Sequence, residues 1–167
     1  MVTPVDASLV ASIAGWFQPP VGYVQLIARF GAIQVRDKQI ITPGWESAHM
    51  MMAHADWLPT GRLYVNKGIW EPLRSAFEAC IALGDGYEIK TLGCFSPRPK
   101  RVNGDLSVHS WGAAVDLNAA TNPLSFDGVL RTDIPATWVA EFEKRGFTWG
   151  GRWSKPDAMH FQFVSGY

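Results

Sequence analysis

Two short segments of alternating side chains constrain the fold of this chain more than any other feature of its sequence. In AAVDLN (113–118), Asp116 stands on the face opposite to the apolar residues. In HFQFV (160–164), His160 stands opposite to two phenylalanines. Because side chains of a strand alternate between the two faces of a sheet, both segments predict strands with one apolar face. If both strands lie in one sheet with their apolar faces buried together, Asp116 and His160 emerge on the same side.

The remainder of the C-terminal hundred residues predicts two helices and a further strand. Hydrophobic spacing predicts a helix over residues 66–83, ended by Gly84, and a shorter helix over residues 136–144. A strand is predicted over residues 87–95. Strands mixed with two helices in this order indicate an α+β fold.

The N-terminal part shows weaker patterns. Helical spacing predicts a helix over residues 5–17, and residues 19–45 contain the strand-like runs YVQLIARF, GAIQV and KQII. Residues 46–58 form a methionine-rich patch with an ambiguous helical pattern. We expect residues 1–65 to be an N-terminal extension packed on the same domain as a core of residues 66–167.

Length and charge exclude several classes of protein. A chain of 167 residues, 47% apolar and 18% charged, can form one domain with a substantial core. Its 15 basic residues balance 15 acidic ones, which argues against a nucleic-acid partner. No segment is long enough to cross a membrane, and the N-terminus lacks the basic region of a signal peptide. We expect a monomer, made in the cytoplasm without a leader and not inserted into a membrane.

The cysteines and the two remaining histidines belong to residue types that bind metals in other proteins, but their spacing does not predict a metal site here. Cys80 and Cys94 are too few for a disulfide framework and too far apart for a CxxC motif. They are compatible with one disulfide or with two buried thiols. His49 and His54, five residues apart on a helix, would not share a face.

Three side chains near the two alternating segments can converge on one point. His109 precedes Asp116 by seven residues, and Gly112 between them lets the backbone bend sharply. With His160 they offer two nitrogens and one carboxylate oxygen, which zinc accepts as ligands. Three protein ligands leave a position for water, as is typical of a catalytic zinc site. Asp157, three residues before His160, can take a proton from that water.

The order and spacing of these residues resemble the M15 peptidases, the family of D-Ala-D-Ala carboxypeptidase-like metallopeptidases. SVHSWGAAVD (107–116) matches the family's SxHxxGxAxD signature, and DAMH (157–160) resembles its second signature. The segments GFTWGGRW (146–153) and FSPR (95–98) are also similar to the family. The resemblance covers about residues 66–165.

The resemblance implies a fold and a role for each site residue. The fold would be a small α+β domain with a central antiparallel sheet, shared with lysostaphin-type peptidases and the hedgehog signalling domain. His109, Asp116 and His160 would bind zinc. Asp157 would be the general base, and Arg98 would bind substrate and stabilise the developing oxyanion, which suits a permanent cation with forked donors.

The resemblance also implies a substrate, the peptidoglycan stem peptide with its D-amino acids. An aspartate at position 157 is similar to the phage lysins that cut between L-Ala and D-Glu, whereas D-Ala-D-Ala enzymes often have glutamate there. We therefore expect a phage or prophage endolysin that acts on the cell wall after release through a membrane lesion. The rival from another class is a non-catalytic, zinc-bearing binding module, as in the hedgehog branch. The presence of Asp157 and Arg98 argues against it.

Some residues near the motifs keep two interpretations. Ser107 can bond within its turn or support a metal ligand, and Asn118 can support the site or form a turn at a strand end. Trp111, Trp149 and Trp153 can line a substrate groove or pack in the core.

Overall fold

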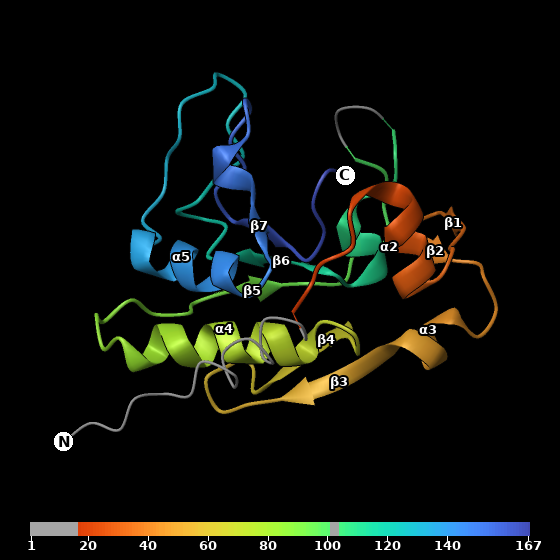
Figure 1. The fold of residues 1–167 in the computed structure, drawn as a ribbon, viewed down its shortest axis with the longest axis horizontal. Coiled ribbons are helices and arrows are strands. Elements are labelled where there is room, and N and C mark those ends of the chain that lie inside the picture. Colours follow the sequence, from red (N-terminus) through yellow and green to blue (C-terminus); the bar gives the residue numbers. More distant parts are fainter. Residues whose placement is uncertain (1–16, 101–103) are drawn as a thin grey trace.

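The computed structural model describes residues 17–100 and 104–167. Helices and three small antiparallel sheets make up this part of the chain (Figure 1), which confirms the predicted α+β class. The largest sheet has the strand order β5-β6-β8-β7 and contains both alternating segments. Its strands are β5 (Leu92–Gly93), β6 (Ala114–Leu117), β7 (Thr148–Trp149) and β8 (His160–Gln162).

Helix α5 (Ala136–Lys144) packs on the apolar face of this sheet, and helix α4 (Trp70–Ala82) packs against α5. The ring of Phe142 in α5 lies 4.9 Å from that of Phe77 in α4 and 4.4 Å from that of Phe161 in β8, between centroids. All three rings are fully buried. Burying one such ring stabilises the fold by roughly 2 kcal/mol. These contacts therefore turn Phe161 inward and leave His160 on the opposite face.

The register of β6 and β8 sets the position of the two polar residues. The strands are antiparallel, with Asp116 opposite His160 and Val115 opposite Phe161. Directly opposed side chains of an antiparallel pair lie on the same face and close together. A slip by one residue would turn either Asp116 or His160 toward the core.

The N-terminal part contains two helices and two hairpins. Its elements are α2 (Gly22–Phe30), β1 (Val35–Arg36), β2 (Gln39–Ile40), α3 (Trp45–His49), β3 (Met50–His54) and β4 (Arg62–Asn66). In Figure 1, α2 lies at the end of the molecule away from α5. The backbone N–H of Asn66 donates to the Gly112 carbonyl at 3.1 Å, so β4 packs against the turn that follows His109. The division at residue 65 stays a prediction.

One predicted element of this part is wrong, and the ambiguous methionine-rich patch is divided between a helix and a strand. The run YVQLIARF (23–30) is helix α2 and not a strand. Leu26 and Phe30, one helical turn apart, are its buried residues, so tertiary burial outweighs the strand preference of its β-branched and aromatic residues. The patch at residues 46–58 is helical only to His49 and continues as strand β3.

Other boundaries are narrower than predicted. The predicted helix 66–83 begins at Trp70, because the chain up to Asn66 pairs in β4. The predicted strand 87–95 is reduced to β5, because the Asn118 side-chain carbonyl accepts the backbone N–H groups of Lys90 and Thr91.

Three further predictions have different outcomes. The helix predicted over residues 136–144 is confirmed as α5. The helix predicted over residues 5–17 lies outside the described residues except for its last one. Cys80 and Cys94 are free, buried thiols, which is one of the two alternatives that the sequence left open.

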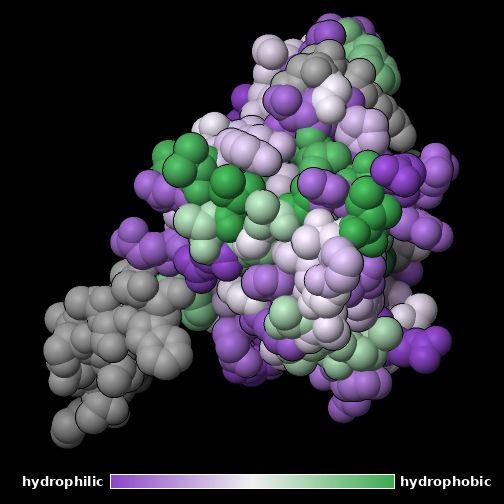
Figure 2. All heavy atoms as spheres, turned by 90° about the vertical axis from the view of Figure 1, so that its right-hand side faces the viewer, coloured by the Kyte–Doolittle hydropathy of each residue, from purple (hydrophilic) through white to green (hydrophobic). Residues whose placement is uncertain are grey.

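Among the described residues, the side of the molecule that carries α2 shows no continuous apolar face. Val24 is 75% exposed and Val21 57%, yet Figure 2 shows the apolar groups on this side separated by polar ones. Within the described ranges, no helix combines the length and apolar character needed to cross a membrane.

Candidate metal centre

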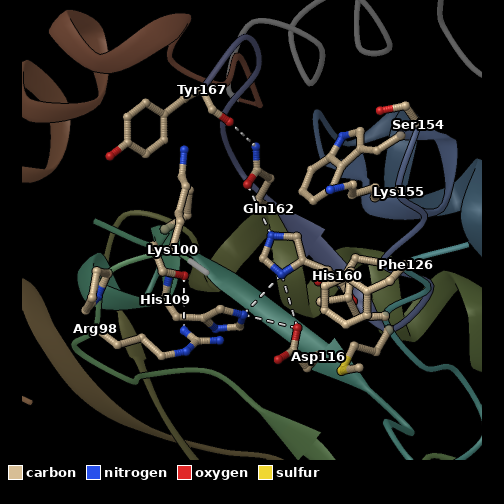
Figure 3. Close-up of a pocket in the computed structure, with 17 residues that line it drawn as sticks. Arg98, Lys100, His109, Asp116, Phe126, Ser154, Lys155, His160, Gln162 and Tyr167 are labelled. Atoms are coloured by element: carbon tan, nitrogen blue, oxygen red, sulfur yellow. Dashed lines mark hydrogen bonds and ion pairs between the residues drawn. The ribbon is translucent and has the colours of Figure 1, made fainter. Parts of the chain in front are cut away.

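A cavity of about 440 Å³ opens at the polar face of β6 and β8 (Figure 3). The five site residues predicted from the sequence all line it: Arg98, His109, Asp116, Asp157 and His160. Segments that are far apart in the sequence thus contribute to one site.

Three acceptor atoms meet at the floor of this cavity. His109 Nε2 lies 3.1 Å from Asp116 Oδ1 and 3.1 Å from His160 Nδ1, and His160 Nδ1 lies 3.1 Å from Asp116 Oδ1. Both histidines are buried, with 2% and 6% of their surface exposed. The convergence expected for His109 with the two strand residues is confirmed as geometry.

Hydrogen bonds on the far side of each imidazole turn its lone pair toward this point. His109 Nδ1 lies 2.6 Å from the Cys94 carbonyl oxygen, which can only accept. His160 Nε2 lies 3.1 Å from Gln162 Oε1, also an acceptor. A neutral imidazole carries a single N–H, so His109 Nε2 and His160 Nδ1 both present lone pairs to Asp116.

This arrangement fits a zinc ion. Three electron-rich atoms 3.1 Å apart repel one another unless a cation lies between them. Zinc bonds of about 2.0–2.1 Å in a tetrahedron separate neighbouring ligand atoms by about 3.3 Å. Two imidazole nitrogens and one carboxylate oxygen are ligands that zinc accepts, and three protein ligands leave one position for solvent.

Burial and charge act in opposite directions on these groups. Without a metal, burial would raise the pKa of the Asp116 carboxyl, but hydrogen bonds and charge from His109 and His160 in their protonated forms hold it well below its usual range. Burial would lower the pKa of His160, but the hydrogen bond and charge of Asp116, helped by the charge of Asp157, raise it. A proton therefore competes with a metal for this site, and acid weakens metal binding.

A glycine turn folds His109 back over β6. The 3₁₀ turn Val108–Trp111 is capped by the Ser107 hydroxyl, which accepts the His109 backbone N–H at 3.4 Å. Gly112 ends the turn with φ of 59°, a left-handed conformation. A Cβ at this position would lie 2.5 Å from Met50 Cε. Both the conformation and the close contact therefore require glycine.

We expect Gly112→Ala to lower the free energy of unfolding by about 3 kcal/mol. Left-handed strain of about 1–2 kcal/mol adds to overpacking of about 1–3 kcal/mol. Gly84→Ala is the matched control, because Gly84 has φ of 65° but a Cβ there would meet no heavy atom within 4 Å. Urea unfolding of both variants separates the two contributions. Equal losses of stability would contradict the packing contribution at Gly112.

Arg98 is held beside His109 by two serines. Its Nη1 donates to the Ser107 hydroxyl at 3.1 Å. Its backbone N–H donates to the Ser110 hydroxyl at 3.0 Å, and that hydroxyl lies 3.1 Å from the Arg98 carbonyl. Ser107 and Ser110 flank His109 in the sequence, so one short segment positions both the metal-ligand candidate and the cation.

Asp157 lies in a turn at the start of β8. Its backbone N–H donates to the Gly150 carbonyl at 3.0 Å, and its carbonyl accepts the His160 N–H at 3.1 Å. A Cβ at Gly150 would lie 2.6 Å from the Asp157 carbonyl oxygen, so glycine permits this close approach. The backbone therefore holds Asp157 in the cavity wall independently of its side chain.

The structure resolves the alternatives that the sequence left open. Ser107 both caps its turn and bonds Arg98. Asn118 has φ of 47° and its side chain bonds the backbone near Tyr87, as expected of a turn former. Of the three tryptophans, Trp153 lines the cavity, whereas the other two are buried in the core.

Several lining residues were not predicted: Lys100, Phe126, Lys155, Gln162 and Tyr167. Lys100 Nζ lies 3.5 Å from the centroid of the Tyr167 ring. Only Gln162 had a usable sequence signal, because the alternation of HFQFV places it on the face of His160. The others lie in loops or after the last strand, where no periodic pattern marks them.

Comparison with protein families gives a match over residues 101–163 to a family described as D-alanyl-D-alanine carboxypeptidase, an M15 peptidase family. This span includes His109, Asp116, Asp157 and His160, whereas Arg98 precedes it. Comparisons with curated proteins and with solved structures found no match. The predicted resemblance to M15 peptidases is confirmed over the matched span.

Proposed function

We propose that this chain is a zinc-dependent peptidase of peptidoglycan stem peptides, and the match of residues 101–163 to the D-alanyl-D-alanine carboxypeptidase family of M15 peptidases supports the proposal. The observation that carries the proposal is the triangle of acceptor atoms from His109, Asp116 and His160 in an open cavity. We further propose a phage or prophage endolysin that acts as a monomer on the cell wall. Its target would be an L-Ala–D-Glu or a D-Ala–D-Ala type of bond.

The proposed mechanism assigns a different chemical role to each site residue. A zinc ion held by the three side chains would supply Lewis acidity, which acidifies water and polarises a peptide carbonyl. Asp157 would accept a proton from the attacking water and deliver it to the leaving amine. Arg98 would donate to the oxygen that becomes negative, because its guanidinium is always charged and Ser107 fixes its orientation.

The charges of the cavity favour an anionic peptide. Arg98, Lys100 and Lys155 line it, and the charge of Asp105, which is not a lining residue, acts on Lys100. Asp116 and Asp157 are the carboxylates of the described lining, and Asp116 would be neutralised by the metal. Stem peptides carry free carboxylates, so this excess of cations supports the proposed substrate class.

Digestion of purified peptidoglycan tests the proposal directly. The zinc-loaded protein would be incubated with cell walls of several chemistries, and new amino groups and muropeptides would be measured, the latter by mass spectrometry. We expect fragments with new amino termini, lost on chelation and restored by zinc. A protein that holds zinc but releases no amine from any wall would contradict the proposal and support the non-catalytic binding module.

Arg98→Lys should lower turnover by at least about tenfold while the zinc content is unchanged. Lysine keeps the charge but cannot bond Ser107 and substrate with a rigid fork, and losing one oxyanion donor costs about a hundredfold or more in known enzymes. Arg152→Lys is the matched control, since Arg152 is exposed, bonds Glu143 and does not line the cavity. Turnover at the wild-type level in Arg98→Lys would reduce Arg98 to a surface residue.

A further inference from the structure

Gln162 is a buried polar residue next to the proposed metal centre, and the proposed mechanism gives it no role. Only 3% of its surface is exposed. Its Oε1 lies 3.1 Å from His160 Nε2, and its Nε2 donates to the Tyr167 carbonyl at 3.3 Å (Figure 3). The same Nε2 donates to the Val164 carbonyl at 3.1 Å. Both polar atoms of this amide therefore have partners.

These partners determine the orientation of the amide. Backbone carbonyls only accept, so the NH₂ group must face Val164 and Tyr167, and the oxygen must face His160. The reversed amide would place its oxygen against two carbonyl oxygens and leave buried polar groups unpaired, which costs more than a typical hydrogen bond contributes. Since an amide oxygen also only accepts, His160 Nε2 must carry the proton.

The proton on Nε2 decides where the lone pair of His160 points. In the neutral ring it leaves Nδ1 unprotonated, 3.1 Å from both Asp116 Oδ1 and His109 Nε2. The tautomer of His109 is set in the same way by the backbone carbonyl of Cys94, a group that a side-chain substitution does not remove. Gln162 is thus the side chain that controls a tautomer at this centre.

We propose that Gln162 is a positioning residue that holds His160 in its Nε2–H tautomer and thereby raises the zinc affinity of the centre. The inference about zinc rests on the proposed function, whereas the inference about the tautomer does not. Groups that bond the outer nitrogen of a metal-bound histidine fix its ring orientation and raise its basicity, and their loss weakens metal binding by about 10–100-fold.

The N-terminal part of the chain supports this arrangement. Gly22 N–H donates to the Ser165 carbonyl at 2.7 Å, and Ser165 N–H donates to the Pro20 carbonyl at 3.0 Å. The ring of Tyr23 stacks on that of Tyr167 with 5.7 Å between centroids. These contacts hold the segment whose carbonyls orient Gln162. The start of α2 therefore contributes to the centre without contacting the three ligand candidates.

Zinc affinity and the tautomer can be measured separately. Gln162→Met keeps the length of the side chain and removes its polar atoms, so we expect zinc binding, measured by chelator competition, to weaken about 10–100-fold. Gln162→Glu keeps an acceptor for His160, so its zinc affinity should stay within severalfold of the wild type even if its stability falls. Asn122→Ala is the control, because Asn122 is also buried but bonds Asp133 in a separate network.

Nitrogen-15 NMR of the metal-free protein in alkaline buffer provides the second readout. We expect the Nε2–H form of His160 in the wild type and in Gln162→Glu, and a mixture of tautomers in Gln162→Met. Unchanged zinc affinity in Gln162→Met, or an Nδ1–H tautomer in the wild type, would overturn the proposal. If the wild type bound no zinc, the proposed function would fail, while the tautomer measurement would still decide the role of Gln162.

Discussion

Replacing His109 or His160 by alanine is expected to remove zinc from the protein and to abolish peptidase activity. Each histidine supplies one of three ligand atoms that lie within 4.8 Å of one another, and two remaining ligands hold zinc poorly. Elemental analysis of the purified variants should show zinc content falling from one ion per chain to almost none. Asp116→Ala should lose zinc and activity together for the same reason.

A matched control separates loss of the metal from loss of a histidine. His54 is exposed on β3 and lies outside the metal centre, so His54→Ala should retain zinc and activity. Zinc should also raise the thermal unfolding midpoint of the wild type and of His54→Ala, because a ligand that binds the native state stabilises it. Added zinc should leave the unfolding midpoints of His109→Ala and His160→Ala unchanged. Stoichiometric zinc in both His109→Ala and His160→Ala would contradict the assignment of these histidines as zinc ligands.

Asp157→Ala is expected to lower turnover by about a hundredfold or more while zinc content stays at the wild-type level. This is the range for a lost general base. Asp157 lies outside the group of close ligand atoms that contains Asp116, so its loss should not release the metal. Its backbone makes the bonds to Gly150 and His160, so the turn should survive removal of the side chain.

The comparison with Asp116→Ala makes this assignment testable. Both variants lose one carboxylate from the same cavity, but only Asp116→Ala should lose zinc. Rate against pH should show an acid limb in the wild type, and that limb would belong to the coupled water and carboxylate pair rather than to Asp157 alone. Loss of zinc from Asp157→Ala, or full activity in it, would show that another group is the base.

The sequence alone was sufficient for the strand faces and for the candidates at the metal centre. Alternation in a strand has a period of two, so Phe161 turned inward necessarily turns His160 outward. The seven residues from His109 to Asp116, with Gly112 between them, similarly allow one local bend. The helix at residues 136–144 was predictable because the apolar residues recur at helical spacing and form the face that the fold buries.

Only the tertiary structure decided the features that depend on partners distant in the sequence. YVQLIARF became a helix because Leu26 and Phe30 are buried together in the tertiary fold, which outweighs the strand preference of the run. Asp116 and His160 are 44 residues apart in the sequence, and they meet because β6 and β8 pair in one particular register. The orientation of Gln162 depends on carbonyls held in place by the start of α2. Such contacts leave no periodic trace in the sequence, because their energy comes from groups that meet only after the chain has folded.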